Sequence, residues 1–259
     1  MFSTYGDALG GIWATWWTKF AIWNLHQLPF QSSWIAAPYA SEVPFLLAPV
    51  DHFIALLPNI VVGPVFAYNF VIVLSFVLSG LGMYFLVKEL LENHLGEKSQ
   101  SSNHLIIYLS ALVAGAIFTF SPYHFVRAWQ HWDLTQIQWI PFYVLFLVRF
   151  SRRKKARELV WALVFFALTL GTNAYYTLGL VFLTVIFVLV ELVAAAIRRP
   201  KSLLWSLPLV LVGLVLGFTI YTNVIKPKVA SYNQPLRDFM IYSLRPHNYL
   251  TPPVWNKYF

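Results

Sequence analysis

The sequence predicts an all-α fold: a polytopic bundle of transmembrane helices, with an N-terminal amphipathic helix at the membrane surface and a short extracytoplasmic tail. Composition is the first reason, since 59% of the 259 residues are hydrophobic and only 11% are charged, whereas about a quarter of a soluble domain is charged. The second reason is that apolar runs near the roughly 20 residues that cross a bilayer recur along the chain. Short basic loops separate these runs, as the positive-inside bias requires.

Charge and cysteine content exclude several classes of function. The formal net charge of +8 does not indicate nucleic-acid binding, because the basic residues gather in loops between apolar runs. The chain has no cysteine, which excludes disulfides and thiolate metal sites. It also lacks a nucleotide-binding glycine motif and a metalloprotease motif. We therefore expect membrane lipids as neighbours and no nucleic-acid partner.

Three parts are expected along the chain. Residues 1–64 form a first extracytoplasmic loop with the amphipathic helix, residues 65–223 a transmembrane bundle of about six helices, and residues 224–259 an extracytoplasmic tail at the start of a missing region. Six prolines between Pro29 and Pro64 exclude a long helix there and favour a surface loop with short helical pieces.

The opening helix carries a carboxylate at its start. Thr15, Thr18 and Lys19 lie off its apolar face. Tryptophan is typical of the headgroup layer, so this face is expected to lie on the membrane. Asp7, with glycines on both sides, would be open to a ligand, or it would only cap the helix. The apolar face consists of Leu9, Ile12, Trp13, Trp16, Phe20 and Trp23.

Five predicted spans follow the N-terminal part. A further apolar run, 158–170, is too short to cross alone and meets a polar, aromatic break at Gly171–Tyr176; such a break is tolerated only within protein or beside a wet cavity. Small residues in the first two spans are expected to let these helices pack closely. The spans are 65–87, 104–120, 136–150, 178–197 and 203–221, and the small residues are Ser79, Gly80, Gly82, Ala111, Ala114, Gly115 and Ala116.

Alternation of the spans predicts which segments share a side of the membrane. The basic segments Lys88–Asn103, Ser151–Arg157 and Arg198–Lys201 would lie together in the cytoplasm. Asp7, the loop Tyr123–Leu134, the break and the tail would then face outward. We expect an integral, multi-pass protein of the inner or plasma membrane with its Asp7 face extracytoplasmic.

The outward segments bring candidate chemistry together. Asp7 and Asp133 are the candidate catalytic acids, and an extended loop would point His131 and Asp133 the same way. Asp7, His131 and Asp133 would hold Mg²⁺ or Mn²⁺, with Arg127 on a phosphate. Simpler roles stay open: Asp133 as a helix cap, Arg127 on lipid phosphate and His131 at the interface. Further substrate contacts are expected from His124, Tyr175 and Tyr176.

Several short motifs resemble one family. The Gly-Asp before a tryptophan-rich helix, LSGLGMY at Leu78–Tyr84, FSPYH at Phe120–His124, QWIPFYVLF at Gln138–Phe146 and TNAYYT at Thr172–Thr177 resemble a group of multi-span bacterial and archaeal proteins similar to the GT-C superfamily of glycosyltransferases. AYN at Ala67–Asn69 and the tail from Tyr242 to Pro253 extend the resemblance over nearly the whole chain.

The resemblance implies transfer of a sugar from a polyprenyl-phosphate carrier at the outer membrane face. It implies an essential acid in the first outward loop, at Asp7, and a second acidic motif at His131–Asp133, where histidine replaces the first acid. The family's first transmembrane helix and later spans are not in this sequence, so we expect a fragment or a separately encoded part.

Two other functions stay open. One is a non-catalytic membrane subunit or scaffold, packed against another membrane subunit and keeping a degenerate glycosyltransferase fold. The other is a transporter that binds its substrate at the break, although the sequence has no inverted repeat. The glycosyltransferase hypothesis requires Asp7 and Asp133 to share one external pocket.

Overall fold

A computed structural model describes residues 8–32, 34, 43–44, 48–95, 102–198 and 218. The chain divides into two compact units, Met1–Gly213 and Leu214–Phe259. Phe218 is the described residue of the second unit, and everything below concerns the first. Asp7, the last predicted span and the predicted tail lie outside the described residues, apart from Phe218.

Helices dominate the described part, which confirms the predicted helical class. Two short strands among the described residues, β1 (Gln31–Ser32) and β2 (Val43–Pro44), pair antiparallel with Gln31 opposite Pro44. The helices are α1 (Ala8–Trp23), α2 (Pro49–Val61), α3 (Pro64–Leu95), α4 (Ser102–Thr119), α5 (Pro122–Gln130), α6 (Trp132–Thr135), α7 (Trp139–Arg153), α8 (Ala156–Thr172) and α9 (Ala174–Arg198).

Three stretches in the described part are long and apolar enough to cross a membrane: Pro64–Glu92, His104–Trp129 and Ala174–Val193. The second combines α4 with α5. Helices α7 and α8, with 15 and 17 residues, fall short of the roughly 20 residues that a span needs. The predicted bundle has about six membrane-crossing helices, and the crossings other than these three stay a prediction.

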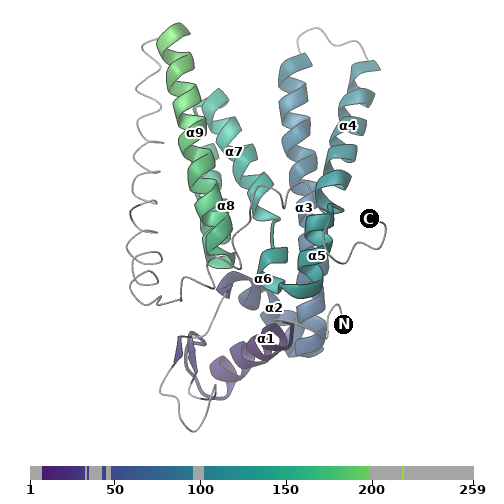
Figure 1. Cartoon of the computed structure of the whole chain (residues 1–259), viewed down its shortest axis with the longest axis vertical. Helices are drawn as coiled ribbons and strands as arrows, with labels where there is room; N and C mark the ends of the chain where they lie inside the picture. The colour runs from purple at the N-terminus through teal and green to yellow at the C-terminus, as the bar shows by residue number, and fades with distance from the viewer. Residues whose placement is uncertain are drawn as a thin grey trace, which may run out of the picture. The chain divides into compact units, whose positions relative to one another are not determined.

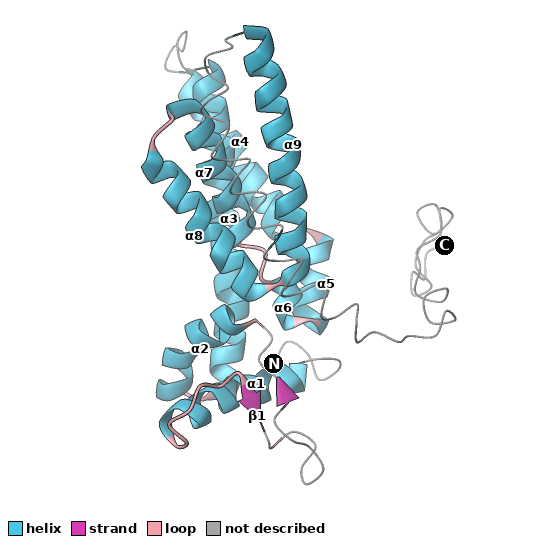
Figure 2. Cartoon of the chain, turned by 90° about the vertical axis from the view of Figure 1, so that its left-hand side faces the viewer, coloured by secondary structure: helices cyan, strands magenta, loops and turns pink. Residues whose placement is uncertain are grey.

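Figures 1 and 2 show α3, α4, α7, α8 and α9 running along one another, with α1 and α2 gathered at one end of this bundle. Helix α1 packs against α2 and α3, and α2 packs against α3 and α8. The core at this end includes Ala8 at the start of α1, Tyr68 on α3 and Trp132 on α6, all with 3% or less of their surface exposed.

Two segments that the sequence analysis assigned to loops are helical. Residues 123–134 contain α5 and α6, because Pro122 favours a first helical turn and the Ser121 hydroxyl accepts a hydrogen bond from the His124 backbone N–H. Helix α3 continues to Leu95, through the first half of the predicted Lys88–Asn103 loop. His131 has an extended backbone but Asp133 lies in the first turn of α6, so the extended run expected to align them is wrong.

Helix α1 buries its small and hydroxyl-bearing side, together with Trp17. Thr15 and Thr18 each donate a hydroxyl hydrogen bond of 2.8 Å to the carbonyl four residues before, which satisfies these polar groups inside the protein. Leu9 and Trp23, on the predicted apolar face, are 62% and 57% exposed. The other four residues of this face are half-buried, and Ile12 among them packs against the core, so only the ends of the predicted apolar face are exposed.

Glycines set the spacing between α3 and α4, as the small-residue faces predicted. A Cβ on Gly115 would lie 2.8 Å from the Gly80 carbonyl oxygen, and one on Gly80 would lie 2.8 Å from the Thr119 hydroxyl. Both distances are shorter than side chains tolerate. The two helices can therefore approach closely only because both positions lack a side chain.

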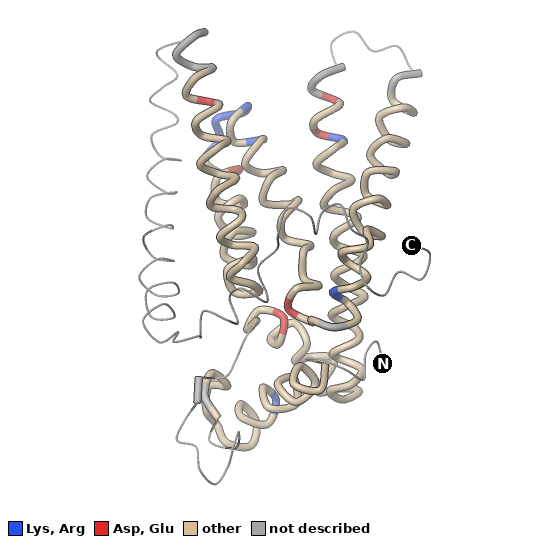
Figure 3. The backbone as a smooth tube through the Cα atoms, viewed as in Figure 1, with Lys and Arg blue, Asp and Glu red and all other residues tan. Residues whose placement is uncertain are grey.

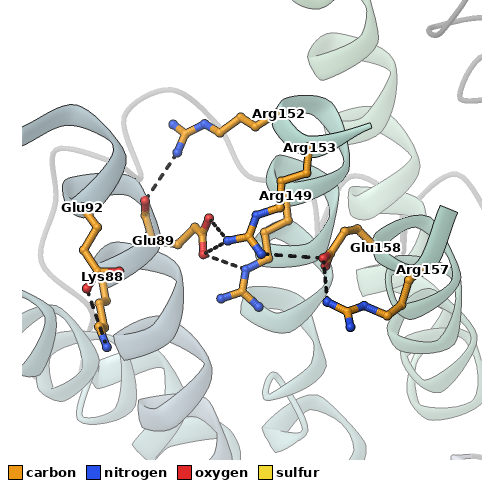
Figure 4. A network of polar contacts seen from close by, with 8 residues as sticks. All are labelled: Lys88, Glu89, Glu92, Arg149, Arg152, Arg153, Arg157 and Glu158. Atoms are coloured by element: carbon orange, nitrogen blue, oxygen red, sulfur yellow. Dashed lines mark hydrogen bonds and ion pairs between the residues drawn. The ribbon is translucent and has the colours of Figure 1, made fainter. Parts of the chain in front are cut away.

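Charged residues gather at the end of the bundle away from α1 and α2 (Figure 3). There the Glu89 carboxylate on α3, 5% exposed, accepts from Arg149 Nε at 2.7 Å and from Arg153 Nη2 at 2.8 Å (Figure 4). Glu158 on α8, also buried, pairs with Arg153 at 3.7 Å and with Arg157 at 3.4 Å. This ion network joins α3, α7 and α8.

Candidate functional site

The break between α8 and α9 holds the carboxylate of α6. Asn173 stands between the two helices with an extended backbone, and its side-chain Nδ2 donates to Asp133 Oδ2 at 2.9 Å. Its Oδ1 accepts from the backbone N–H groups of Tyr175 at 2.8 Å and Tyr176 at 3.3 Å. Asn173 is therefore the N-cap of α9 and a hydrogen-bond donor to Asp133 at the same time.

A second carboxylate contacts the end of α8. Asp51, in the first turn of α2, is fully buried, and its Oδ1 accepts a hydrogen bond of 3.4 Å from the Thr172 hydroxyl. Its Oδ2 has no hydrogen-bond partner among the described residues. Burial raises the pKa of the Asp51 carboxyl well above its usual range, the Thr172 hydrogen bond opposes this, and the negative charge of Asp133 adds to it.

Close packing of α2 on α8 brings these groups together. A Cβ on Gly171 would lie 2.5 Å from Val50 Cγ2, so a larger residue at this position would force the helices apart. Val50 and Asp51 on α2 thus face Gly171 and Thr172 at the end of α8. The glycine allows the Asp51–Thr172 contact.

Aromatic and basic residues border Asp133 on the α5 side. The Tyr176 hydroxyl donates to the Leu134 carbonyl, and the Tyr123 and Tyr176 hydroxyls are 2.8 Å apart. Arg127, on α5, lies over the Tyr123 ring at 5.1 Å. Tyr123 thus links Arg127 to Tyr176, whose hydroxyl bonds the carbonyl of the residue that follows Asp133.

The remaining predicted site residues fall in different surroundings. His124 is fully buried: its ring is 3.9 Å from the Phe76 ring, and its nitrogens contact the Thr119 carbonyl at 2.8 Å and the Ser75 hydroxyl at 3.3 Å. This position favours packing over contact with a substrate. Tyr175 is 77% exposed. His131 joins α5 to α6 and is half-buried.

Sequence reasoning missed Asp51, Thr172 and Asn173 as members of the site. Asp51 stands in an apolar, proline-rich segment, where a carboxylate is conspicuous, but only the fold pairs it with residues more than a hundred positions later. Asn173 lies in the break that the sequence marked as unusual. The polar break could therefore be found from the sequence. The carboxylates that contact it, Asp51 and Asp133, could not be matched to it without the fold.

The donor set for a divalent ion is incomplete in the described part. No group of three or more histidine or acidic side chains placed to share a metal ion occurs among the residues that the structure describes. Of the three predicted ligands, His131 and Asp133 are described and Asp7 is not. Asp51 is also a poor ligand, because burial raises its pKa and disfavours the ionised form in which carboxylates bind metals. These residues do not fit an ion on their own.

The described residues form a helical bundle with three segments suited to cross a membrane and a polar junction at one end. Comparison with known proteins gives no match to a family model, to a curated protein or to a solved structure. Its function must therefore be inferred from the junction itself.

Proposed function

We propose that the chain is a multi-pass membrane glycosyltransferase, or the membrane part of one, that transfers a sugar from a polyprenyl-phosphate donor at the outer membrane face. The observation that carries the proposal is a half-buried carboxylate, Asp133, held by Asn173, next to a chain of contacts in which Tyr176 bonds the Leu134 carbonyl and Tyr123, and Arg127 lies over the Tyr123 ring. It lies at the end of the bundle opposite the basic α7–α8 turn.

Asp133 is suited to act as a general base. In the proposed step the acceptor hydroxyl gives its proton to Asp133 while its oxygen forms a bond to the anomeric carbon of the sugar. The bond between that carbon and the carrier phosphate oxygen breaks, and the carrier leaves as polyprenyl phosphate. Arg127 would neutralise charge on this phosphate through its guanidinium, and Tyr176 with the exposed Tyr175 would border the sugar.

Asp7 belongs to the proposal through its neighbour in the chain. Ala8, which follows Asp7, is packed in the same core cluster as Trp132, which precedes Asp133. This supports a site to which both acids contribute, as the sequence analysis expected. Mg²⁺ or Mn²⁺ on Asp7, His131 and Asp133 stays a prediction. Loss of transfer when a chelator is added would support it.

A membrane location is supported by the apolar surface. Large apolar side chains on α3, α4 and α9 are exposed along the length of these helices, among them Val73, Val113 and Ile186, at 52%, 55% and 62%. A soluble protein rarely exposes so continuous an apolar surface. With the basic α7–α8 turn in the cytoplasm, the Asp133 end faces outward across the inner or plasma membrane.

The test is sugar transfer by the full-length chain in membranes supplied with radiolabelled polyprenyl-phosphate sugar. Asp133→Asn and Asp7→Asn should each reduce transfer at least tenfold with unchanged protein levels. Glu92→Gln is the matched control, because Glu92 is partly exposed on α3 and pairs only with Lys88 at 3.7 Å in the described part. Transfer that survives both aspartate substitutions would reject the proposal.

A non-catalytic subunit is the second candidate, and one observation favours it. The contact of Asp133 with Asn173 joins α6 to the first turn of α9, which is also what a purely structural pair would do. This candidate predicts that Asp133→Asn lowers the melting temperature of the detergent-solubilised protein. It also predicts that, in membranes that contain the partner subunit, wild type and Asp133→Asn support equal transfer per amount of folded protein.

A further inference from the structure

An apolar groove lies between α3, α7 and α8, toward the charged end of the bundle. Its volume is about 400 Å³, within the roughly 300–1,000 Å³ of sites that hold small molecules. Aromatic rings make most of its wall, so the groove is suited to a hydrocarbon chain more than to a polar ligand. The rings are Phe85 on α3, Phe142 and Phe146 on α7, and Trp161 and Phe165 on α8, and Arg149 on α7 lines the groove with them.

The rings of this wall hold one another in place. Phe165 stacks on Phe142 at 5.0 Å and on Phe146 at 5.5 Å, and the Trp161 ring lies 6.0 Å from Phe146. Helices α3 and α7 meet beside Phe142, because a Cβ on Gly82 would lie 3.1 Å from the Phe142 ring. Stacked aromatic rings form a stable surface, so the wall is in place before a ligand arrives.

Arg149 stands where the groove meets the ion network (Figure 4). Its Nε donates to Glu89 at 2.7 Å, and its guanidinium lies over the Phe146 ring at 5.5 Å. No interaction reaches its two terminal nitrogens in Figure 4, and the structure records no partner for them in the described part of the chain. Arg149 therefore offers two N–H groups side by side, the arrangement that binds phosphate oxygens.

Positive charge exceeds negative charge around Arg149. Six basic residues lie from Arg149 to Arg157, whereas the carboxylates of this network are Glu89 and Glu158. Both carboxylates are buried and already paired with arginines, so four positive charges have no carboxylate in the network. Basic clusters of this size at a cytoplasmic membrane surface attract anionic headgroups. The charge of this end thus complements a lipid of net negative charge.

We propose that the groove binds one anionic phospholipid of the cytoplasmic leaflet, with an acyl chain along the aromatic wall and the phosphate on Arg149. The exposed Arg152, which donates to the Glu89 backbone carbonyl at 3.4 Å, stands beside this headgroup position. The inference rests on the membrane location in the proposed function and not on its chemistry, because the groove lies toward the end of the bundle opposite Asp133.

Photo-crosslinking of the purified full-length protein tests the site without any variant. The probe is phosphatidylglycerol with a photoreactive acyl chain, and mass spectrometry of the peptides locates the label. We expect about tenfold more label on residues 142–165 than around Val113, an exposed apolar side chain on α4. Unlabelled phosphatidylglycerol should compete at about a tenth of the concentration that phosphatidylcholine with the same chains requires, since the charge-assisted contact adds to the burial of the chain.

Three results would overturn the inference. The first is equal labelling around Val113 and on residues 142–165, which would show general contact with lipid. The second is equal competition by phosphatidylcholine. The third is competition by inorganic phosphate as strong as that by phosphatidylglycerol, which would show an anion site without a lipid chain.

Two arginine variants test the headgroup contact. Arg149→Gln removes the paired donors and should lower labelling of residues 142–165 about tenfold. Arg157→Gln is the matched control, because Arg157 is 74% exposed and pairs with Glu158 without lining the groove, and it should label like the wild type. Undiminished labelling of folded Arg149→Gln would overturn the role of Arg149.

Asp133→Asn separates this inference from the proposed function. It should label like the wild type while losing sugar transfer. If it labels normally and still transfers sugar, the lipid site stands and the glycosyltransferase proposal fails. If the wild type transfers sugar but its label is spread evenly over the apolar surface, the lipid site fails and the glycosyltransferase proposal stands.

Discussion

The Asn173 side chain donates a 2.9 Å hydrogen bond to Asp133 while its carbonyl oxygen caps α9. One amide thus serves a helix start and a carboxylate from a separate segment forty residues earlier. The interruption that divides α8 from α9 is therefore more than a bend, since it supplies the donor that orients Asp133.

Substituting Asn173 separates its two contributions. Asn173→Ser keeps an N-cap oxygen but removes the amide N–H, whereas Asn173→Ala removes both. We expect both variants to reduce transfer at least tenfold, because Asp133 loses its donor. The loss of the cap should cost Asn173→Ala about 1 kcal/mol more in unfolding free energy than Asn173→Ser. Thermal unfolding in detergent, measured beside the transfer assay, checks this order, and equal stability of the two variants would contradict the capping role.

Gly171 should tolerate no side chain. The Cβ of Gly171→Ala would meet Val50 Cγ2 at 2.5 Å, so we expect a loss of about 1–3 kcal/mol in unfolding free energy from overpacking and a weaker Asp51–Thr172 contact. Gly179→Ala on α9 is the matched control, because nothing lies within 4 Å of its Cβ. That control should be neutral or slightly stabilising, since alanine favours helix. Val50→Ala should partly rescue Gly171→Ala, and a failure of rescue would argue against the clash.

Glu89→Gln should destabilise the other end of the bundle. It leaves Arg149 and Arg153 without their shared carboxylate. Removing one partner of a fully buried pair costs about 3–5 kcal/mol, and we expect less, about 1–3 kcal/mol, because both arginines are partly exposed. Glu92→Gln should change the melting temperature little. Equal effects of the two substitutions would show that the network adds no stability.

Asp51→Asn should stabilise the folded protein as pH rises. The folded-state pKa of Asp51 is raised by burial, so the folded state holds this proton more tightly than the unfolded chain does. The Asp51 contribution is then fully present below the unfolded pKa and is lost as pH rises through the folded value. The melting temperature of Asp51→Asn should exceed that of the wild type at neutral and alkaline pH and converge with it in acid. A variant that melts lower at every pH would contradict this.

The helical class and the close packing of α3 on α4 could be predicted from the sequence, because both depend on local patterns. Long apolar runs specify helices in lipid, and the small residues around Gly80 and Gly115 mark a contact surface. The break at Asn173 was predictable for the same reason, since polar and aromatic residues interrupt an apolar run.

The contact of Asp51 with Thr172 was not predictable. It depends on α2, a 13-residue helix that begins at Pro49 and contains Pro58, in a segment where the sequence indicated a surface loop with short helical pieces. Proline at the first turn costs little because the N–H there has no helical acceptor. The loop expected at 123–134 was also wrong, since Ser121 and Pro122 start a helix that the charged and aromatic residues obscured.

The short length of α7 and α8 has a consequence for the surrounding lipid. At 1.5 Å per residue, their 15 and 17 residues extend about 23–26 Å, against the about 30 Å of a bilayer's hydrocarbon core. If both helices cross the membrane, as the proposed function requires, the bilayer would have to thin beside them. If the α8–α9 junction faces outward as the proposed function requires, this thinning would bring the outer headgroups closer to the junction, and a lipid-borne phosphate could reach Asp133 from its own leaflet.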